Sequence, residues 1–329
     1  MPMPLSWNIL DIDCQTEADA ICARLREILA RVLRKRGLVV AISGGIDSSV
    51  CAGLAVRAIG SERVFGLILP ERDSSPDSEA RARALGHCLQ LSILRTDIAP
   101  TLEAIGCYRW RDDAVRRAVP EYRDDWGMKI VIAGGLEGQV NHFRIVAESP
   151  SGERVERRLS LVDYLEIVAA TNFKQRVRKT LEYFHADRLN YAVVGTPNRL
   201  EYDQGFFVKN GDGAADVKPI AHLYKTQVYA MARFLGLPES ICVAEPTTDT
   251  YSLPQGQDEF YFSLPYRSMD LALWAHNDGR PAGELAGLLQ VTEAQASLVY
   301  ADIEAKRRTS RYLHLPAQLV KPVEGAFAE

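Results

Sequence analysis

The chain has 329 residues, 47% hydrophobic and 25% charged, so it can bury a full core and has the composition of a globular protein. Its formal net charge is −4 and it has no long basic run, which argues against nucleic acid as a partner. The first residues do not resemble a signal peptide and no stretch approaches 18 consecutive apolar residues, so we expect no membrane partner. Six scattered cysteines without a Cys-x-x-Cys pair predict reduced thiols and a cytoplasmic location.

The first third of the chain predicts alternating helices and strands. Helical spacing over residues 16–35 is followed by an apolar strand over 38–42, a helix over 48–58 and a second strand over 63–69. A helix over 78–89 and a strand over 91–94 continue the alternation. This order predicts an α/β fold with a doubly wound, mostly parallel sheet and helices on both faces, in which ligands bind at the carboxyl ends of the strands.

Residues from about 120 to 160 break this alternation. Three short strand-like runs, over 128–133, 142–148 and 154–160, are separated by turns rich in glycine and serine. We interpret them as a small β meander inserted into the α/β frame, and the whole chain, 1–329, as one domain with this insertion. The stretch 111–117 before the meander is strongly charged, which favours a solvated helix face.

The rest of the chain returns to the earlier pattern. Helical spacing over 162–185 precedes a strand over 191–194, and a polar, glycine-rich loop then continues to about residue 219. A helix over 225–235 follows, and the tail from residue 257 is mainly helical.

The strongest functional signal is the turn that follows the strand over 38–42. A Ser-Gly-Gly turn between strand and helix presents free backbone N–H groups and the positive end of a helix to a phosphate. The hydroxyls of Ser43 and Ser48 can donate hydrogen bonds to phosphate oxygens, whereas Asp47 is an anion like the phosphate, so its position predicts a Mg²⁺ ion between them. The sequence lacks the Gly-Lys-Ser/Thr of a Walker A loop. It resembles instead the Ser-Gly-Gly-x-Asp-Ser loop of the N-type ATP pyrophosphatases, which cleave ATP between the α- and β-phosphates to adenylate a substrate.

A second group of motifs follows the strand over 191–194. In order, it contains Gly195-Thr196, Glu201, Gly205-Phe206-Phe207, Lys209, Gly211-Asp212-Gly213, Asp216 and, at the start of a helix, Lys225. Asn172, Arg176 and Arg178 precede this group on a predicted helix, and Pro246-Thr247-Thr248-Asp249 and Asp270 follow it. Over roughly residues 15–310, apart from the meander, the order and spacing resemble the synthetase domain of NAD synthetase.

The resemblance implies a role for each matching position. ATP would be contacted by Ala41, Ile42, Ser43, Gly44, Gly45, Ile46, Asp47, Ser48, Thr196, Lys225 and Thr247, Mg²⁺ would be held by Asp47 and Glu201, and the dinucleotide would be bound by Arg176, Lys209, Asp216, Lys306 and Arg307. The alternative for Arg176 is a solvated helix face, and for the Lys306-Arg307 pair a basic helix end. Because Lys225 opens a helix whose dipole opposes a cation, we expect a phosphate beside it.

The implied reaction converts nicotinic acid adenine dinucleotide (deamido-NAD), ATP and ammonia to NAD, AMP and pyrophosphate through an acyl-adenylate. The catalytic candidates are Asp47, Lys225, Asp212 and Asp216, and either of the last two can accept the ammonium proton. The glutamine-using members carry a separate amidase domain, for which this chain has no room, so nitrogen is expected from free ammonia or a partner amidase.

Two features leave other interpretations open. Pro197 follows Thr196 where the family often has glycine, and the meander is unusual in a compact member of the family. One alternative is therefore an amide-forming ligase for a different carboxylic acid, and another is a nucleotide-binding regulator without activity. The resemblance also implies a homodimer. Because strands that leave the main sheet need a cover for their edge, we predict that residues 128–160 pack at or near the dimer interface and the substrate entrance.

Overall fold

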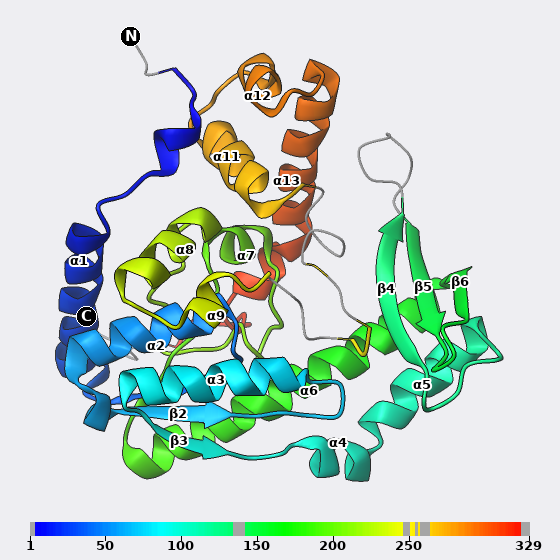
Figure 1. Cartoon of the computed structure of the whole chain (residues 1–329), viewed down its shortest axis with the longest axis horizontal. Helices are drawn as coiled ribbons and strands as arrows, with labels where there is room; N and C mark the ends of the chain where they lie inside the picture. The colour runs from blue at the N-terminus through cyan, green and yellow to red at the C-terminus, as the bar shows by residue number, and fades with distance from the viewer. Residues whose placement is uncertain (1–3, 134–141, 246–250, 254–255, 257–263, 324–329) are drawn as a thin grey trace.

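A four-stranded parallel sheet forms the centre of the main body of the molecule (Figure 1). The computed structural model describes residues 4–133, 142–245, 251–253, 256 and 264–323. The sheet has the order β3-β2-β1-β7, and Leu38 of β1 lies opposite Val64 of β2 and Ala192 of β7. Its strands are β1 (Leu38–Ala41), β2 (Val64–Ile68), β3 (Ser92–Arg95) and β7 (Ala192–Val193). The chain moves outward from β1 to β3 and returns on the other side of β1, so the order reverses between β1 and β7, which is where open α/β sheets bind ligands.

Helices cover both faces of this sheet because its strands are apolar on both sides. Leu38 and Val40 of β1 pack in one cluster with residues of α1, α2 and α8, whereas Val39 packs in another with residues of α4, α5 and α6. These helices are α1 (Cys14–Glu27, continued by a wider turn over Ile28–Leu33), α2 (Ile46–Ile59), α4 (Ala99–Ile105), α5 (Cys107–Ala118), α6 (Leu161–Leu189) and α8 (Lys225–Phe234). The predicted doubly wound α/β fold is therefore confirmed.

The remaining helices complete the frame. They are α3 (Pro76–Leu89), α7 (Arg199–Gln204), α9 (Glu239–Cys242), α11 (Tyr266–Asn277), α12 (Ala282–Leu289) and α13 (Glu293–His314). Figure 1 shows α11 to α13 as a layer beyond α7 and α8, and they share an apolar cluster that includes Leu200 of α7. No helix within the described ranges is long and apolar enough to cross a lipid bilayer.

The predicted meander is a three-stranded antiparallel sheet, β4-β5-β6, to one side of the main body (Figure 1). Its strands are β4 (Gly127–Ala133), β5 (His142–Glu148) and β6 (Arg154–Arg158). Ile130 and Ile145, which pair across β4 and β5, belong to a core of their own that also takes in Val115 of α5 and Ile167 of α6. Helix α6 therefore belongs to both cores, because its later residues Ala170 and Ala186 pack under the parallel sheet.

One expectation about the segment before the meander is wrong. Arg111 was expected on a solvated helix face, but its side chain is only 2% exposed. It donates to Asp73, at 2.5 Å, and to Asp112, at 2.7 Å, and Lys174 of α6 contacts the same Asp73 at 2.6 Å. This buried network ties α5 and α6 to the loop after β2.

Candidate active site

The Ser-Gly-Gly turn between β1 and α2 is closed by its own hydroxyl groups. The Oγ of Ser48 accepts from the backbone N–H of Ser43 at 3.2 Å and donates to the carbonyl of Gly45 at 3.1 Å. Gly44 has φ +80°, and a Cβ there would lie 2.1 Å from the carbonyl oxygen of Ser78. Only glycine fits this position, so the backbone lies open toward the space above the strand ends.

Asp47 lies in the first turn of α2 and meets two side chains from distant parts of the chain. The ammonium of Lys225 contacts its Oδ2, and the Nδ2 of Asn198 donates to its Oδ1 at 3.0 Å. The backbone N–H of Asn198 donates to Glu201 at 3.1 Å, in the capping box that starts α7. Asn198 is 1% exposed and donates to both carboxylates, so this one buried residue fixes the positions of Asp47 and Glu201.

Lys225 is a buried cation at the start of α8. Burial alone would lower the pKa of its ammonium, but the carboxylates of Asp47 and Glu201 outweigh burial and hold this pKa above its ordinary value. The first N–H groups of α8 donate to Asp270, from Lys225 at 3.1 Å and from Thr226 at 2.7 Å. A cation at the start of a helix is unfavourable, and the sequence analysis expected a phosphate beside Lys225 to compensate for it. In the structure, the carboxylates of Asp47 and Asp270 compensate for it instead. Burial raises the pKa of Asp270 to about 7.

A cavity of about 830 Å³ lies over the turn and collects most of the predicted site residues. It is bounded by the turn, one side of α6, the segment from Thr196 to Asp212, and α13. Of the predicted residues, its walls include Ser43, Gly44, Gly45, Ile46, Asp47, Ser48, Arg176, Thr196, Glu201, Lys209, Asp212, Lys225 and Lys306. A smaller cavity of about 240 Å³ adjoins it and is lined by Ala41 and Ile42, with Ser43, Ser48, Thr196 and Asp212 common to both.

Two of the predicted residues that the structure describes lie elsewhere. Asp216 lines neither cavity, and its carboxylate accepts from the backbone N–H of Val193 at 2.7 Å. Arg307 also lies outside both cavities and forms an ion pair with Asp203 at 2.6 Å. Thr247 is outside the described residues. Their assigned roles stay predictions.

The cations around the large cavity connect its walls to α13. The ammonium of Lys209 donates to the carbonyls of Tyr312 and Leu315, both at 2.9 Å, and so caps the C-terminal end of α13. The carbonyl of Lys209 accepts from Nε of Arg176 at 3.2 Å. Lys306 is paired with Asp302 at 2.6 Å, and burial lowers the pKa of its ammonium. Arg176 and Lys209 are thus linked by a direct contact.

The sequence analysis missed two side chains at this site. The pattern Asn198-x-x-Glu201 is a capping signature and would have predicted both α7 and the position of Asn198. Arg81 of α3 donates to the carbonyl of Gly44 at 3.1 Å and lines the large cavity, but nothing in its local sequence marks it.

The donor set is suited to Mg²⁺ bound together with phosphate. Among the described residues, no group of three or more His, Cys, Asp or Glu side chains is placed to enclose a metal ion. Asp47 and Glu201 nevertheless offer hard carboxylate oxygens that both accept from Asn198, and both residues line the large cavity. Mg²⁺ is often bound by one or two carboxylates together with substrate phosphates. The residues therefore fit a metal that arrives with a nucleotide.

Comparison with known proteins agrees with this geometry. The NAD synthase family matches residues 17–117 and 150–311. The chain belongs to the NAD synthase family. Strands β4 and β5 lie between the two matched segments, so the family match does not include this part of the insertion.

Individual relatives extend the match. The NH(3)-dependent NAD(+) synthetase of Rhizobium meliloti (strain 1021) is 57% identical over 320 residues, which cover 97% of this chain and 96% of the relative. An NMN synthetase from Francisella tularensis has a TM-score of 0.65 at 22% identity, over 94% of this chain and 99% of that one. The NH3-dependent NAD synthetase from Campylobacter jejuni has a TM-score of 0.60 at 20% identity, over 94% and 100%. At these identities the two structures support the fold alone. The family match and the relative from Rhizobium meliloti confirm the resemblance found in the sequence.

Proposed function

We propose that this protein is an ammonia-dependent NAD synthetase, a ligase that amidates deamido-NAD at the expense of ATP. The observation that carries the proposal is the convergence of the glycine turn, the Asp47–Lys225 pair and Glu201 on one cavity. The 57% identity to an NH(3)-dependent NAD(+) synthetase over nearly the whole chain supports the same conclusion. It makes the regulator without activity and the ligase for another acid the weaker alternatives.

The first step is adenylation of the substrate. A carboxylate oxygen attacks the α-phosphorus of ATP, the bond to the bridging oxygen breaks, and pyrophosphate leaves. We assign the open backbone around Gly44 and Gly45, with the hydroxyls of Ser43 and Ser48, to the phosphates, and Lys225 to the charge that develops on the leaving group. Mg²⁺, held by Asp47 and Glu201, would add further neutralisation of that charge when bound.

The second step is amide formation. Ammonia attacks the acyl carbon, AMP leaves with the oxygen that came from the carboxylate, and one proton must be removed from nitrogen. We favour Asp212 over Asp216 as the acceptor, because Asp212 lines both cavities. Burial raises the pKa of the Asp212 carboxyl, which makes its carboxylate a better base.

The dinucleotide is assigned to the part of the large cavity between α6 and α13. Arg176, Lys209 and Lys306 line it and can bind the substrate's pyrophosphate. Because Lys209 caps α13, we propose that substrate entry replaces this contact with one to the substrate.

Assembly and location belong to the proposal as well. Three apolar side chains at the start of α6 are exposed, Leu161 by 70%, Val162 by 69% and Leu165 by 54%. An apolar surface of this kind beside the insertion supports the predicted homodimer. A cytoplasmic location and a separate amidase that supplies ammonia stay predictions.

The test is a product balance. Purified protein, ATP, Mg²⁺ and deamido-NAD should yield NAD, AMP and pyrophosphate in equal amounts with an ammonium salt, and none with glutamine alone. The rate at fixed total ammonium should rise with pH below about 9, because neutral ammonia is the nucleophile. Efficient use of glutamine, or turnover of another acid with deamido-NAD inert, would contradict the proposal.

A further inference from the structure

Helix α6 connects the two sheets and presents one stripe of side chains to the large cavity. The stripe contains Tyr164, Val168, Asn172 and Arg176, at intervals of four residues. Such spacing places them on one side of a helix, and the twelve residue steps from Tyr164 to Arg176 span about 18 Å. The far end of the stripe is close to the phosphate turn, because Gln175, next to Arg176, lines both cavities together with Ser43 and Ser48.

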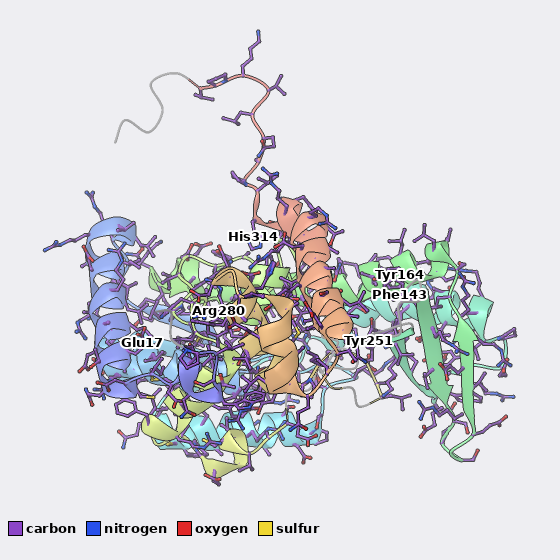
Figure 2. All side chains as sticks on the ribbon, turned by 90° about the horizontal axis from the view of Figure 1, so that it is seen from above. Glu17, Phe143, Tyr164, Tyr251, Arg280 and His314 are labelled. Carbon is purple, nitrogen blue, oxygen red and sulfur yellow. The ribbon has the colours of Figure 1, made fainter. Side chains whose placement is uncertain are left out.

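Tyr164, at the N-terminal end of the stripe, forms an aromatic pair with a residue of the insertion. Phe143 of β5 lies on the ring of Tyr164, with the ring centroids 3.8 Å apart and the planes at 14°. Figure 2 shows both residues where the insertion sheet meets the rest of the molecule, with Tyr251 near them. Alternation along β5 places Phe143 on the same side as Ile145 and Ala147, which are buried in the insertion core. Phe143 is the member of that row that reaches the cavity.

The aromatic pair is only partly explained by packing. Ile145 and Ala147 are fully buried, whereas Phe143 and Tyr164 are half-buried and both line the cavity. The two rings already stack on each other, so their positions are fixed before any ligand arrives. A flat apolar surface of this kind, at the wall of a polar cavity, is suited to an aromatic ring.

The distance along α6 indicates which ring of the substrate the aromatic pair binds. The reacting carboxylate must lie at the α-phosphate of ATP, beside the glycine turn, and the aromatic pair is about 16 Å from Gln175 along the helix axis. A group joined directly to the carboxylate cannot reach that far, whereas the second base of a dinucleotide can.

We propose that Phe143 and Tyr164 form a subsite for the purine base of the dinucleotide substrate, at the end remote from the reacting carboxylate. This inference rests on the proposed function. It makes Phe143, a residue in the segment that the family match leaves out, a determinant of substrate size. The phosphate chemistry needs neither ring.

The test compares two ligands that share the reacting end. Deamido-NAD carries the purine base, and nicotinic acid mononucleotide lacks it. For wild type and Phe143→Ala, the KM for deamido-NAD and the Ki of the mononucleotide as a competitor are measured at saturating ATP. Stacking of a base on an aromatic side chain contributes enough that its loss should raise the KM for deamido-NAD about tenfold. The Ki of the mononucleotide and the KM for ATP should change less than about twofold, within the scatter expected of an uninvolved site.

Two further variants keep the result interpretable. Phe143→Tyr retains a ring and should restore most of the affinity for deamido-NAD. Arg144→Ala changes the next residue of β5, whose ion pair with Glu156 points away from the cavity, and should leave all three constants unchanged. If Phe143→Ala does not fold, Phe143→Leu, which keeps apolar volume but no ring, replaces it.

Each outcome is decisive. An equal loss for both ligands would place the pyridine ring at the pair and overturn the assignment, and so would an unchanged KM for deamido-NAD. If the wild type makes no NAD from deamido-NAD, the proposed function fails and the inference with it. That outcome is distinct, because it is seen before any variant is made.

Discussion

The two sheets lie at opposite ends of α6 and contribute different things to one cavity. The parallel sheet supplies polar groups at its strand ends, and each is held by specific contacts, such as those of Asn198 with Asp47 and Glu201. The antiparallel sheet supplies one apolar ring, Phe143, held by stacking and by the row of core residues behind it. In the proposed reaction, the first region stabilises a charged transition state and the second recognises the substrate.

The residues assigned to the phosphate chemistry and the residue assigned to substrate recognition come from different segments of the chain. The polar groups lie in segments that the NAD synthase family matches, whereas Phe143 lies in the gap between them. Chemistry that must stabilise charge needs fixed donors and carboxylates, and those require particular residues at particular positions. A recognition surface needs only shape and apolar area, so an insertion can supply it.

We expect the largest effect, on the free energy of unfolding, from a change in the buried ion-pair network between α5, α6 and the loop after β2. Arg111→Met removes the cation between Asp73 and Asp112 and leaves both carboxylates short of a partner in a buried position. Loss of one partner of a buried ion pair costs roughly 3–5 kcal/mol in the free energy of unfolding. Denaturant unfolding should show this loss. Arg116→Ala, on the same helix, removes a cation whose ion pairs with the exposed Asp113 and Asp124 are worth little, so it should cost less than about 1 kcal/mol. Equal stabilities of the two variants would show that the network does not link the insertion to the sheet.

The next effect is confined to the polar region. Asp47→Asn keeps the size of the side chain but removes the charge that faces Lys225 and the proposed Mg²⁺. Turnover should fall on the order of 10²-fold or more, because charge stabilisation in the transition state is lost. Steady-state rates at saturating and limiting Mg²⁺ measure it, with circular dichroism as the control for folding. Near-normal turnover at limiting Mg²⁺ would remove Asp47 from the metal site.

A smaller effect concerns pH and the cap of α8. Burial raises the pKa of Asp270 to about 7, so between its unfolded value and that pH the native state binds more protons than the unfolded state. The stability that this carboxyl contributes is complete below its unfolded pKa and is lost as pH rises through about 7. The free energy of unfolding of the wild type, relative to Asp270→Asn, should therefore fall by on the order of 2 kcal/mol between pH 5 and pH 8. A difference that does not change with pH, or that grows in favour of the wild type, would show that Asp270 is already ionised at pH 5.

Much of the fold was predictable because periodicity and turns are local. The three strands of the meander and helix α8 begin and end within a few residues of their predicted limits. Helix α7 was missed because it has six residues inside a glycine-rich segment, although its capping box was visible in the sequence. The single-domain interpretation is still a prediction.

The site was predictable where its chemistry lies in a contiguous motif, and less so where it depends on packing. The glycine turn was predicted from its residues between a strand and a helix, and Glu201 from the resemblance to the family's motif; both line the large cavity. The burial of Arg111 depends on Asp73, 38 residues earlier, and only the tertiary fold brings them together. The stacking of Phe143 depends on the register of β5 and on the tertiary contact between Phe143 and Tyr164 of α6, and neither leaves a local pattern.

The most direct test follows the carboxylate oxygen. Deamido-NAD labelled with ¹⁸O in its carboxylate is converted with ATP, Mg²⁺ and ammonium, and the ¹⁸O content of each product is measured by mass spectrometry. If the cavity at the glycine turn forms an acyl-adenylate, each AMP carries one ¹⁸O from the substrate and pyrophosphate carries none. Label in pyrophosphate or inorganic phosphate, or ADP in place of AMP, would mean that the carboxylate attacks a different phosphorus, and the proposed chemistry of this site would be wrong.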